Sequence, residues 1–336
     1  MDASNIIDVI AAADDNYAMP LAVAVASVCQ RLDPNHRIRL FLLARELSDA
    51  NLRRLEDTFR GNPIDLRIIE PDVGMIADLS VSHHISHAAY YRLLAGELLP
   101  QEIDKAIYLD CDVLVCDDLL DLWRQPLADN YCLATVDIAC PYIDARLGCQ
   151  NFRRANPYMA SLQPVRNYLE LGLDGRSEYF NSGVMVLNLD RWRRENIAHR
   201  LLKTLRDHRR HVWCWDQYAL NVLFHKNWGR FDPRWNQGAH VYEYPDARRV
   251  PIDVQEWQTM KNNPSVIHFT TEFKPWHPKV THPSAELFFD VLNDTAWHAW
   301  QPDPRSLTAR DHFNRGMFRV IKSSTITSRK LVSMWP

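Results

Sequence analysis

Short apolar runs alternate with longer amphipathic stretches along the first third of the chain. An apolar run of about four to eight residues predicts a buried strand, whereas apolar residues recurring every three to four positions predict a helix. The expected strands are 6–13, 38–43, 64–69 and 106–109, and the expected helices are 21–32, 48–59 and 86–94. Pro20 suits the first position of the first helix, and Ser48 suits the N-cap of the second. This order predicts a mostly parallel sheet that is covered by helices on both faces.

The pattern resumes in the second half of the chain after a long interruption. Residues 138–176 are polar and mixed, with prolines at positions 141, 157 and 164. Long irregular insertions tend to carry function, so we expect this excursion to lie over the active-site face. Beyond it, the expected strands are 184–189 and 265–269, and the expected helices are 191–208 and 216–224.

The end of the strand expected at 106–109 is the first candidate for chemistry. Asp110 and Asp112 follow this strand with one residue between them. Residues i and i+2 of an extended chain point to the same side, so both carboxylates can converge on one ion. Two hard oxygen ligands suit Mg²⁺ or Mn²⁺ that is also held by phosphates. Acidic turn residues are common after strands, so the pair alone leaves a simple turn as the alternative.

Composition narrows the class of protein. The 336 residues carry a net charge of −3, which argues against a nucleic-acid binder. The ten glycines form neither a G-x-G-x-x-G fingerprint nor a P-loop. The seven cysteines include no C-x-x-C pair, which favours a reduced cytosolic protein over a disulfide scaffold or zinc ribbon. No apolar run approaches the roughly 18 residues of a membrane span, and the first residues lack the basic start of a signal peptide.

Two more strand ends carry candidate binding residues, one for a nucleotide and one for a metal ion. Asp14 and Asn16 can bond a uracil or a ribose, and Tyr17 can stack on a base. A helix N-cap before Pro20 is an equally good interpretation of the two polar residues. His268 could complete a site of two oxygens and one nitrogen that is typical of Mn²⁺, although a core histidine is the simpler reading.

Four smaller clusters remain ambiguous. The histidine-rich segment 83–87 fits no zinc spacing and favours a polar loop with one functional histidine. Segment 180–183 precedes a strand and places the amide of Asn181 near the edge of the sheet where the aspartate pair is expected. Segment 213–217 combines tryptophan with a carboxylate and an amide, a composition common in sugar sites, yet tryptophans are more often simply packed. The aspartates at 117–118 are expected to cap a helix at 119–123.

Taken together, these segments resemble glycosyltransferase family 8, particularly the bacterial lipooligosaccharide galactosyltransferases and lipopolysaccharide glucosyltransferases. The resemblance is carried by AADDNYAMP (12–20), HHIS and AYYRL (83–93), IYLDCDVLV (107–115), VD (136–137), YFNSGVMVLNLDRWR (179–193), WDQYALN (215–221) and HFTTEFKPWH (268–277). Several independent motifs in the family order are a far more specific signal than any one of them alone.

The resemblance implies an α/β fold of the GT-A type, with a single Rossmann-like, mostly parallel sheet in a catalytic domain of residues 1–300. It implies retaining transfer of a hexose from UDP-galactose or UDP-glucose, with Mn²⁺ or else Mg²⁺, to a glycan or glycolipid such as a lipopolysaccharide core. Two alternatives come from other classes of protein. A nucleotidyltransferase could also use paired aspartates, but its usual glycine-rich loop is missing here. A non-catalytic carbohydrate-binding protein would have no use for an aligned set of metal ligands.

The resemblance also assigns roles to individual residues. The implied metal ligands are Asp110, Asp112 and His268. The implied donor-binding residues are Ala12, Asp14, Asn16, Tyr17, Arg92, Asp110, Cys111, Asp137, Thr271 and Lys274, of which the last would bind the diphosphate. The implied catalytic residues are Gln217, Asp216 and Asn181. His84 and the rim of the 138–176 excursion would face the acceptor.

One position departs from the family pattern. The bacterial relatives usually have a glycine soon after the metal histidine, near the diphosphate, whereas this chain has Thr271 and Glu272 there. Glycine allows a close approach of the backbone, so the replacement leaves the shape of this loop and the choice of acceptor open.

The last segment, residues 301–336, differs in character from the rest. From Arg305 to Pro336 it has seven basic residues and one acidic residue, interleaved with aromatic and aliphatic side chains. This composition is typical of an interfacial helix on anionic lipid, although a solvated tail is the alternative. We expect a small helical segment that holds a cytoplasmic enzyme against the inner face of the cytoplasmic membrane.

Overall fold

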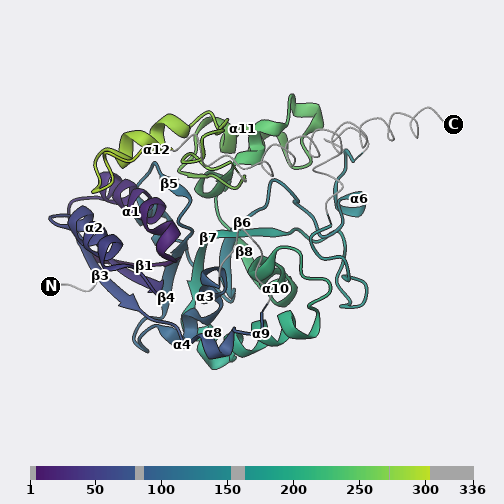
Figure 1. The fold of residues 1–336 in the computed structure, drawn as a ribbon. Helices are drawn as coiled ribbons and strands as arrows, with labels where there is room; N and C mark the ends of the chain where they lie inside the picture. The colour runs from purple at the N-terminus through teal and green to yellow at the C-terminus, as the bar shows by residue number, and fades with distance from the viewer. Residues whose placement is uncertain (1–4, 80–86, 153–162, 272, 303–336) are drawn as a thin grey trace.

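A seven-stranded sheet forms the centre of the protein in the computed structural model, which describes residues 5–79, 87–152, 163–271 and 273–302 (Figure 1). Its strands, in the order β3-β2-β1-β4-β7-β6-β8, are β3 Ile64–Ile69, β2 Arg37–Ala44, β1 Ile6–Ala13, β4 Lys105–Leu109, β7 Phe180–Asn188, β6 Cys132–Val136 and β8 Trp228–Arg230. Strand β1 pairs in parallel with β2 and β4, and only β7 runs antiparallel to its neighbours. The expected mostly parallel sheet is confirmed.

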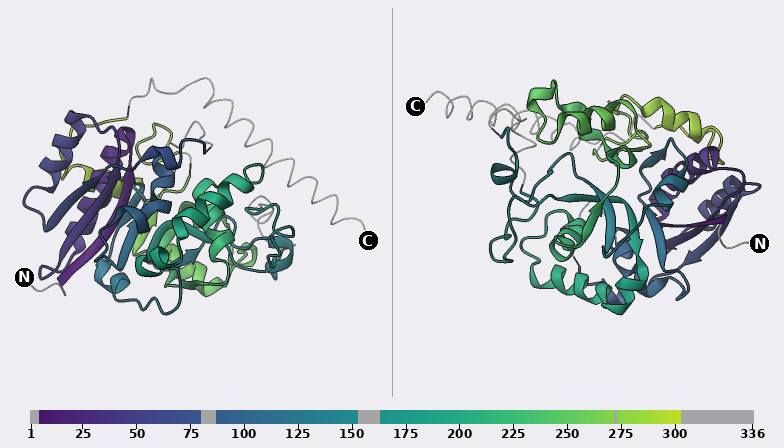
Figure 2. Two further views of the ribbon diagram at one scale, coloured as in Figure 1. Left: turned by 90° about the horizontal axis from the view of Figure 1, so that it is seen from below. Right: turned by 180° about the vertical axis from the view of Figure 1, so that it is seen from behind.

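Helices cover both faces of this sheet (Figures 1 and 2). One face packs against α1 Ala18–Arg31, α2 Asp49–Phe59, α5 Leu119–Trp123 and α12 Ala285–Leu292. The other face packs against α3 Ala88–Tyr91, α4 Ala95–Leu98, α8 Leu189–Arg194, α9 Ile197–Asp207 and α10 Trp215–Phe224. Helix α12 lies beside α1, although nearly the whole chain separates them in sequence (Figure 2).

Alternation along the strands explains why both faces are covered. Val9 and Ala11 of β1 pack in the core on the α1 side, whereas Ile10 packs in the core on the other side. A strand buried on both faces needs mostly apolar residues, which is why β1 is apolar at every position except Asp8, whose carboxylate accepts a hydrogen bond from Nε of Arg39.

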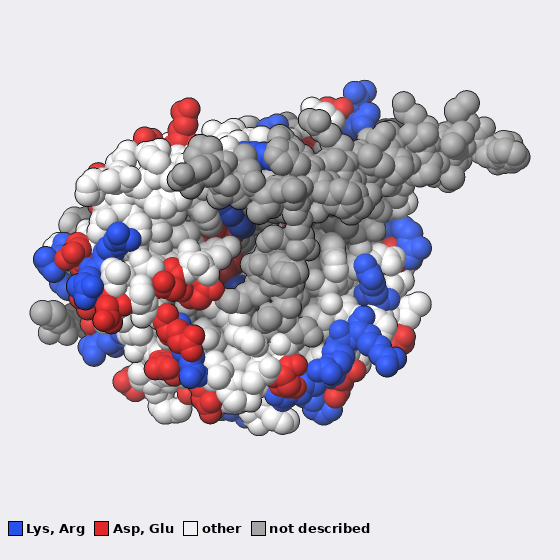
Figure 3. All heavy atoms as spheres, viewed as in Figure 1, with Lys and Arg blue, Asp and Glu red and all other residues white. Residues whose placement is uncertain are grey.

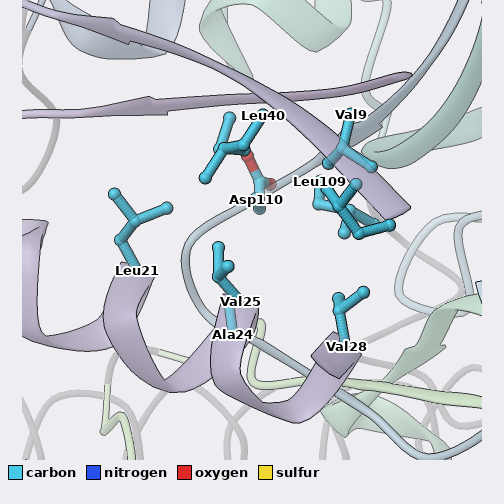
Figure 4. A pocket seen from close by; sticks show the side chains of 10 residues that line it. Val9, Leu21, Ala24, Val25, Val28, Leu40, Leu109 and Asp110 are labelled. Carbon is cyan, nitrogen blue, oxygen red and sulfur yellow. The ribbon is translucent and has the colours of Figure 1, made fainter. Parts of the chain in front are cut away.

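Figure 4 shows a small space between α1 and strands β1, β2 and β4. It is lined by Val9, Ala11, Leu21, Ala24, Val25, Val28, Ile38, Leu40, Leu109 and Asp110. Asp110 is the one polar residue in this lining. A site for a nucleotide sugar needs several convergent polar groups, so this space belongs to the packing of the core.

A second sheet of three strands lies beside the first. Its order is β5-β10-β9, with β5 Val113–Val115, β10 Val266–His268 and β9 Gln237–Gly238. Strand β10 pairs antiparallel with β5, so that His268 lies opposite Val113. Because β5 directly follows the aspartate pair, this pairing carries the carboxyl end of β10 to the carboxyl end of β4.

The remaining helices among the described residues are short. They are α6 Ala145–Gly148, α11 Val254–Asn262 and the 3-10 turns η2 Asp15–Tyr17, η3 Val73–Met75, η4 Arg92–Leu94, η5 Pro233–Asn236, η6 Ala239–Glu243 and η7 Ala247–Arg249. In the part of the chain that the structure describes, no helix has the length and apolar character needed to cross a membrane. Residues 303–336, on which the expected membrane segment falls, lie outside the described residues.

Several expected elements differ in the structure. Strand β7 begins at Phe180, before its expected start at 184. The helix expected at 191–208 is divided into α8 and α9, because Asn196 adopts a left-handed conformation with φ 51°. The helix expected at 86–94 is a succession of α3, η4 and α4. Helix α1 begins at Ala18, so Pro20 is its third residue and not its first, a position where the missing N–H is still no loss.

Candidate active site

The ends of β4 and β10 bring two carboxylates and one imidazole together. Nε2 of His268 lies 3.2 Å from Oδ1 of Asp112 and 3.6 Å from Oδ2 of Asp110. Ligand atoms of all three residues lie within 4.8 Å of one another. Carboxylate oxygens with one imidazole nitrogen form a donor set that suits Mn²⁺ or Mg²⁺, so the residues present fit the implied divalent metal.

Gly183 of β7 provides the room for this cluster. A Cβ atom at this position would lie 2.2 Å from Cε1 of His268 and 2.7 Å from Oδ2 of Asp110. The carbonyl of Gly183 also accepts a hydrogen bond of 2.8 Å from the backbone N–H of Asp110. Any side chain here would occupy the space between the imidazole and the carboxylates. The segment 180–183 attracted attention in the sequence for its amide, and the need for glycine became visible only in three dimensions.

Lys274 sets the electrostatics of Asp112. Nζ of Lys274 donates to Oδ2 of Asp112 at 2.5 Å and to the carbonyl of Phe269 at 2.6 Å. Burial alone would raise the pKa of the Asp112 carboxyl, but Lys274 and His268 hold that pKa well below its ordinary value. Asp112 is therefore ionised at any physiological pH, as a metal ligand must be. The expected diphosphate-binding lysine thus lies directly at the metal cluster.

Arg92 ties the metal cluster to the interior. Its Nη2 donates to Oδ1 of Asp110 at 2.6 Å, and its Nε lies 3.1 Å from Oδ2 of Asp216. The hydroxyl of Tyr108 donates to the same Oδ1 atom at 3.0 Å. Because Oδ1 of Asp110 is bonded twice, the carboxylate is fixed with Oδ2 towards His268. Because Arg92 is only 6% exposed, water can solvate little of its charge, and the carboxylates of Asp110 and Asp216 balance that charge instead.

Asp216 is the second residue of α10 and is buried behind Arg92. Burial raises the pKa of its carboxyl to about 6, against the attraction of Arg92, which lowers it. Its Oδ2 accepts a hydrogen bond of 3.2 Å from the hydroxyl of Ser182. Ser182 was not among the expected site residues, yet its backbone N–H also donates to Oε1 of Gln217 at 3.0 Å and so fixes that amide.

An amide and carboxylate network continues from Gln217. Nε2 of Gln217 and Nδ2 of Asn181 both donate to Oδ2 of Asp137, at 2.9 and 3.0 Å. Oδ1 of Asn181 accepts from the backbone N–H of Gly183 at 2.9 Å. Asp137, Asn181 and Gln217 therefore form one connected set next to the metal cluster, and their roles towards the donor sugar stay predictions.

The loop after β1 supplies the side expected to hold the nucleoside. Oδ1 of Asp14 accepts from the backbone N–H groups of Asn16 and Tyr17, at 3.0 and 3.1 Å. The N-cap interpretation of Asp14 is thus confirmed, with the cap on the turn η2. Tyr17 packs edge to face on Trp276, with ring centroids 6.0 Å apart. Trp276 was not singled out in the sequence as a site residue, and its pairing with Tyr17 could not be foreseen from spacing.

The remaining expected donor-binding residues lie near these groups, whereas the expected acceptor residue lies outside the residues that the structure describes. Sγ of Cys111 donates to the carbonyl of Ala12 at 3.1 Å, which joins the strand ends of β1 and β4. Thr271 follows β10 closely, and its hydroxyl lies 3.5 Å from the carbonyl of Phe273. His84, Glu272 and the part of the excursion at 153–162 lie outside the described residues.

The sheet and the acidic site at its carboxyl edge are those of a glycosyltransferase of the GT-A type. Residues 8–279 match the model of the family described as Glycosyl transferase family 8, and the chain belongs to this family. The expected family, fold and enzyme class are confirmed. Membership of a family of glycosyltransferases leaves no support for a non-catalytic carbohydrate-binding protein or for a nucleotidyltransferase.

Three similar proteins illustrate this membership. General stress protein A of Bacillus subtilis (strain 168) is 27% identical over 301 residues, which are 89% of this chain and 97% of that protein. Lipopolysaccharide 1,3-galactosyltransferase of Salmonella typhimurium is 22% identical over 288 residues, or 84% of this chain and 77% of that protein. The crystal structure of the galactosyltransferase LgtC with donor and acceptor sugar analogs superposes with a TM-score of 0.71 and 29% identity, over 86% of this chain and 96% of that chain.

Proposed function

We propose that this glycosyltransferase moves a hexose from UDP-galactose or UDP-glucose to a glycan or glycolipid, with Mn²⁺ or Mg²⁺ held by Asp110, Asp112 and His268. The observation that carries the proposal is the convergence of these three side chains beside the network of Asp137, Asn181 and Gln217. The names of relatives, which include a lipopolysaccharide galactosyltransferase and lipopolysaccharide glucosyltransferases, support a hexose donor and an acceptor such as a lipopolysaccharide core.

The division of labour follows from the geometry. The metal, when bound, supplies positive charge that stabilises the departing diphosphate. Lys274 is close enough to this position to bind the same phosphates. The loop at Asp14, Asn16 and Tyr17 would hold the uridine. Side chains with several hydrogen-bond donors and acceptors, rather than glycine-rich backbone, would therefore position the donor.

We expect retention of configuration at the anomeric carbon. An inverting enzyme needs a carboxylate base on the far side of the ring, whereas the residue that the family resemblance places near this carbon is Gln217, whose amide is a poor nucleophile. Attack from the front face, with the leaving phosphate accepting the proton of the acceptor, is consistent with these residues. Gln217 or Asn181 would stabilise the cationic sugar. Proton NMR of the product should show an α-linkage, and a β-linkage would refute this route.

The first test is an assay for slow release of UDP from a panel of UDP-sugars in the presence of Mn²⁺. One hexose donor should release UDP faster than the others, because a few polar side chains distinguish the orientation of one hydroxyl. Asp110→Ala and Asp112→Ala should each abolish turnover and leave the circular dichroism spectrum unchanged. Full activity in EDTA would contradict the metal requirement. The substitution Asp207→Asn on the exposed side of α9 is a matched control that should leave the rate unchanged.

We further propose that the enzyme is cytoplasmic and held at an anionic membrane surface by residues 305–336. Figure 3 shows lysines and arginines gathered over α9 on one face of the protein. Several of these are paired with acids, including Lys203 with Asp207 and Arg206 with Asp78. This patch therefore has little unbalanced charge, and the proposal depends on the sequence of the C-terminal segment.

A further inference from the structure

We infer that Asn236 is a positioning residue that fixes the metal-binding orientation and tautomer of His268. Oδ1 of Asn236 lies 2.9 Å from Nδ1 of His268, on the side of the ring opposite to the aspartate pair. Asn236 is the last residue of η5 and is 3% exposed, so water does not compete for this contact. The inference rests on the proposed metal site, and it assigns a function to a residue that no sequence motif singled out.

The surrounding hydrogen bonds determine which way the amide of Asn236 points. The backbone N–H of Gly183 can only donate, so Oδ1 of Asn181 is its acceptor at 2.9 Å. Nδ2 of Asn181 then faces the carboxylate of Asp137 at 3.0 Å, as its donor requires. Nδ2 of Asn236 donates to that same Oδ1 atom of Asn181 at 3.0 Å. Oδ1 of Asn236 must therefore point towards His268.

The orientation of this amide fixes the proton on the imidazole. An amide oxygen can only accept, so Nδ1 of His268 carries the proton that it donates to Asn236. Nε2 is then the nitrogen left with a lone pair, and it faces Asp110 and Asp112. A histidine that binds metal commonly donates its other N–H to an oxygen in this way, which orients the ring and raises the basicity of the ligand. Here the oxygen comes from an amide that is itself anchored through Asn181.

Titration with Mn²⁺, followed by electron paramagnetic resonance of the free ion, tests this role without reference to activity. Asn236→Leu keeps the volume and removes the acceptor, so it should weaken Mn²⁺ binding by about 10- to 100-fold. Asn236→Asp keeps an oxygen towards Nδ1 and should restore most of the affinity. Gln237→Leu is the matched control, because Gln237 is the next residue, is equally buried and bonds the carbonyl of Met260 instead. Its affinity for Mn²⁺ should equal that of the wild type.

Each outcome decides the question. Equal affinity of the wild type and Asn236→Leu, an equal loss in Asn236→Asp, or an equal loss in Gln237→Leu would overturn the positioning role alone. Failure of the wild-type protein to bind Mn²⁺ would overturn the metal site itself. Should Asn236→Leu not fold, ¹⁵N NMR of the histidines in the metal-free wild type at alkaline pH gives the answer, because a metal on Nε2 would itself force the proton onto Nδ1. His268 must then show a protonated Nδ1 and an Nε2 without a proton, and the opposite tautomer would overturn the inference.

Discussion

The buried carboxyl of Asp216 makes the stability of the protein depend on pH at the scale of one residue. Its pKa is about 6 in the folded protein and close to 3.8 when exposed. Between these values the folded state binds more protons than the unfolded state, so the stabilisation is complete below about pH 4 and is lost as the pH rises through 6. At 1.36 kcal/mol for each pH unit, the loss is about 3 kcal/mol.

Chemical denaturation in EDTA, compared between the wild type and Asp216→Asn, measures this effect. The free energy of unfolding of the wild type should fall relative to the variant by about 3 kcal/mol between about pH 3 and pH 7. Asp207→Asn provides a control of opposite sign, because Lys203 lowers the pKa of that exposed carboxyl. A difference between wild type and Asp216→Asn that is flat, or that rises with pH, would contradict the assignment.

Single residues also show how far the site could be predicted from sequence. Asp110 and Asp112 were found because alternation along a strand dictates that they share a side. Asn236 and Ser182 were not found, because their hydrogen bonds join segments that are distant in sequence and carry no spacing rule. The role of Gly183 was missed too, because a glycine is needed there only to leave room for the side chains of His268 and Asp110.

The observed helices and strands agree with the predicted ones where local interactions, such as helix caps and strand periodicity, determine their boundaries. Strand β3 spans Ile64–Ile69 as expected, and the hydroxyl of Ser48 caps α2 by accepting from the backbone N–H of Asn51. Likewise, Asp118 caps α5 by accepting from Leu120. The break at Asn196 was missed, because the apolar periodicity continues through it and only a left-handed residue reveals the turn between α8 and α9. Asparagine tolerates that conformation better than most residues.

The sequence predicted a mostly parallel sheet, but it could not predict which strands pair or that β10 joins a second sheet. The strand expected at 265–269 exists as β10, but it belongs to the small second sheet and not to the central one. Strand β7 was expected without an orientation, and it runs antiparallel between β4 and β6. Pairing partners are chosen by tertiary contacts, and a short apolar run such as β10 fits either sheet equally well.

The site exists only at the scale of the whole molecule. Its parts come from the loop after β1, from the end of β4, from the start of β7 and α10, and from the end of β10. The central sheet brings the first three together, and the pairing of β10 with β5 adds His268. Family resemblance could name these residues in advance because the family shares the fold, whereas composition and periodicity alone could not have joined them.

The last prediction concerns attachment of the whole enzyme to a membrane. The stretch from 305 to 336 has seven basic residues against one acid, and each basic residue near an anionic surface contributes about 1 kcal/mol. The interleaved aromatic and aliphatic residues add shallow insertion, which a merely solvated tail would not need. Attachment should therefore be reversible and sensitive to salt, because the charges are screened.

Truncation after Gln301 tests this directly. The truncated enzyme should sediment less with anionic liposomes than the full chain, remain more soluble, and keep its activity on a soluble acceptor. Zwitterionic liposomes are the control, since they lack the negative surface and should capture neither form strongly. A second variant, in which the seven basic residues are replaced by glutamine and the apolar residues are kept, separates charge from insertion. If the truncated protein pelleted with anionic liposomes as well as the full chain, the membrane role of this segment would be wrong.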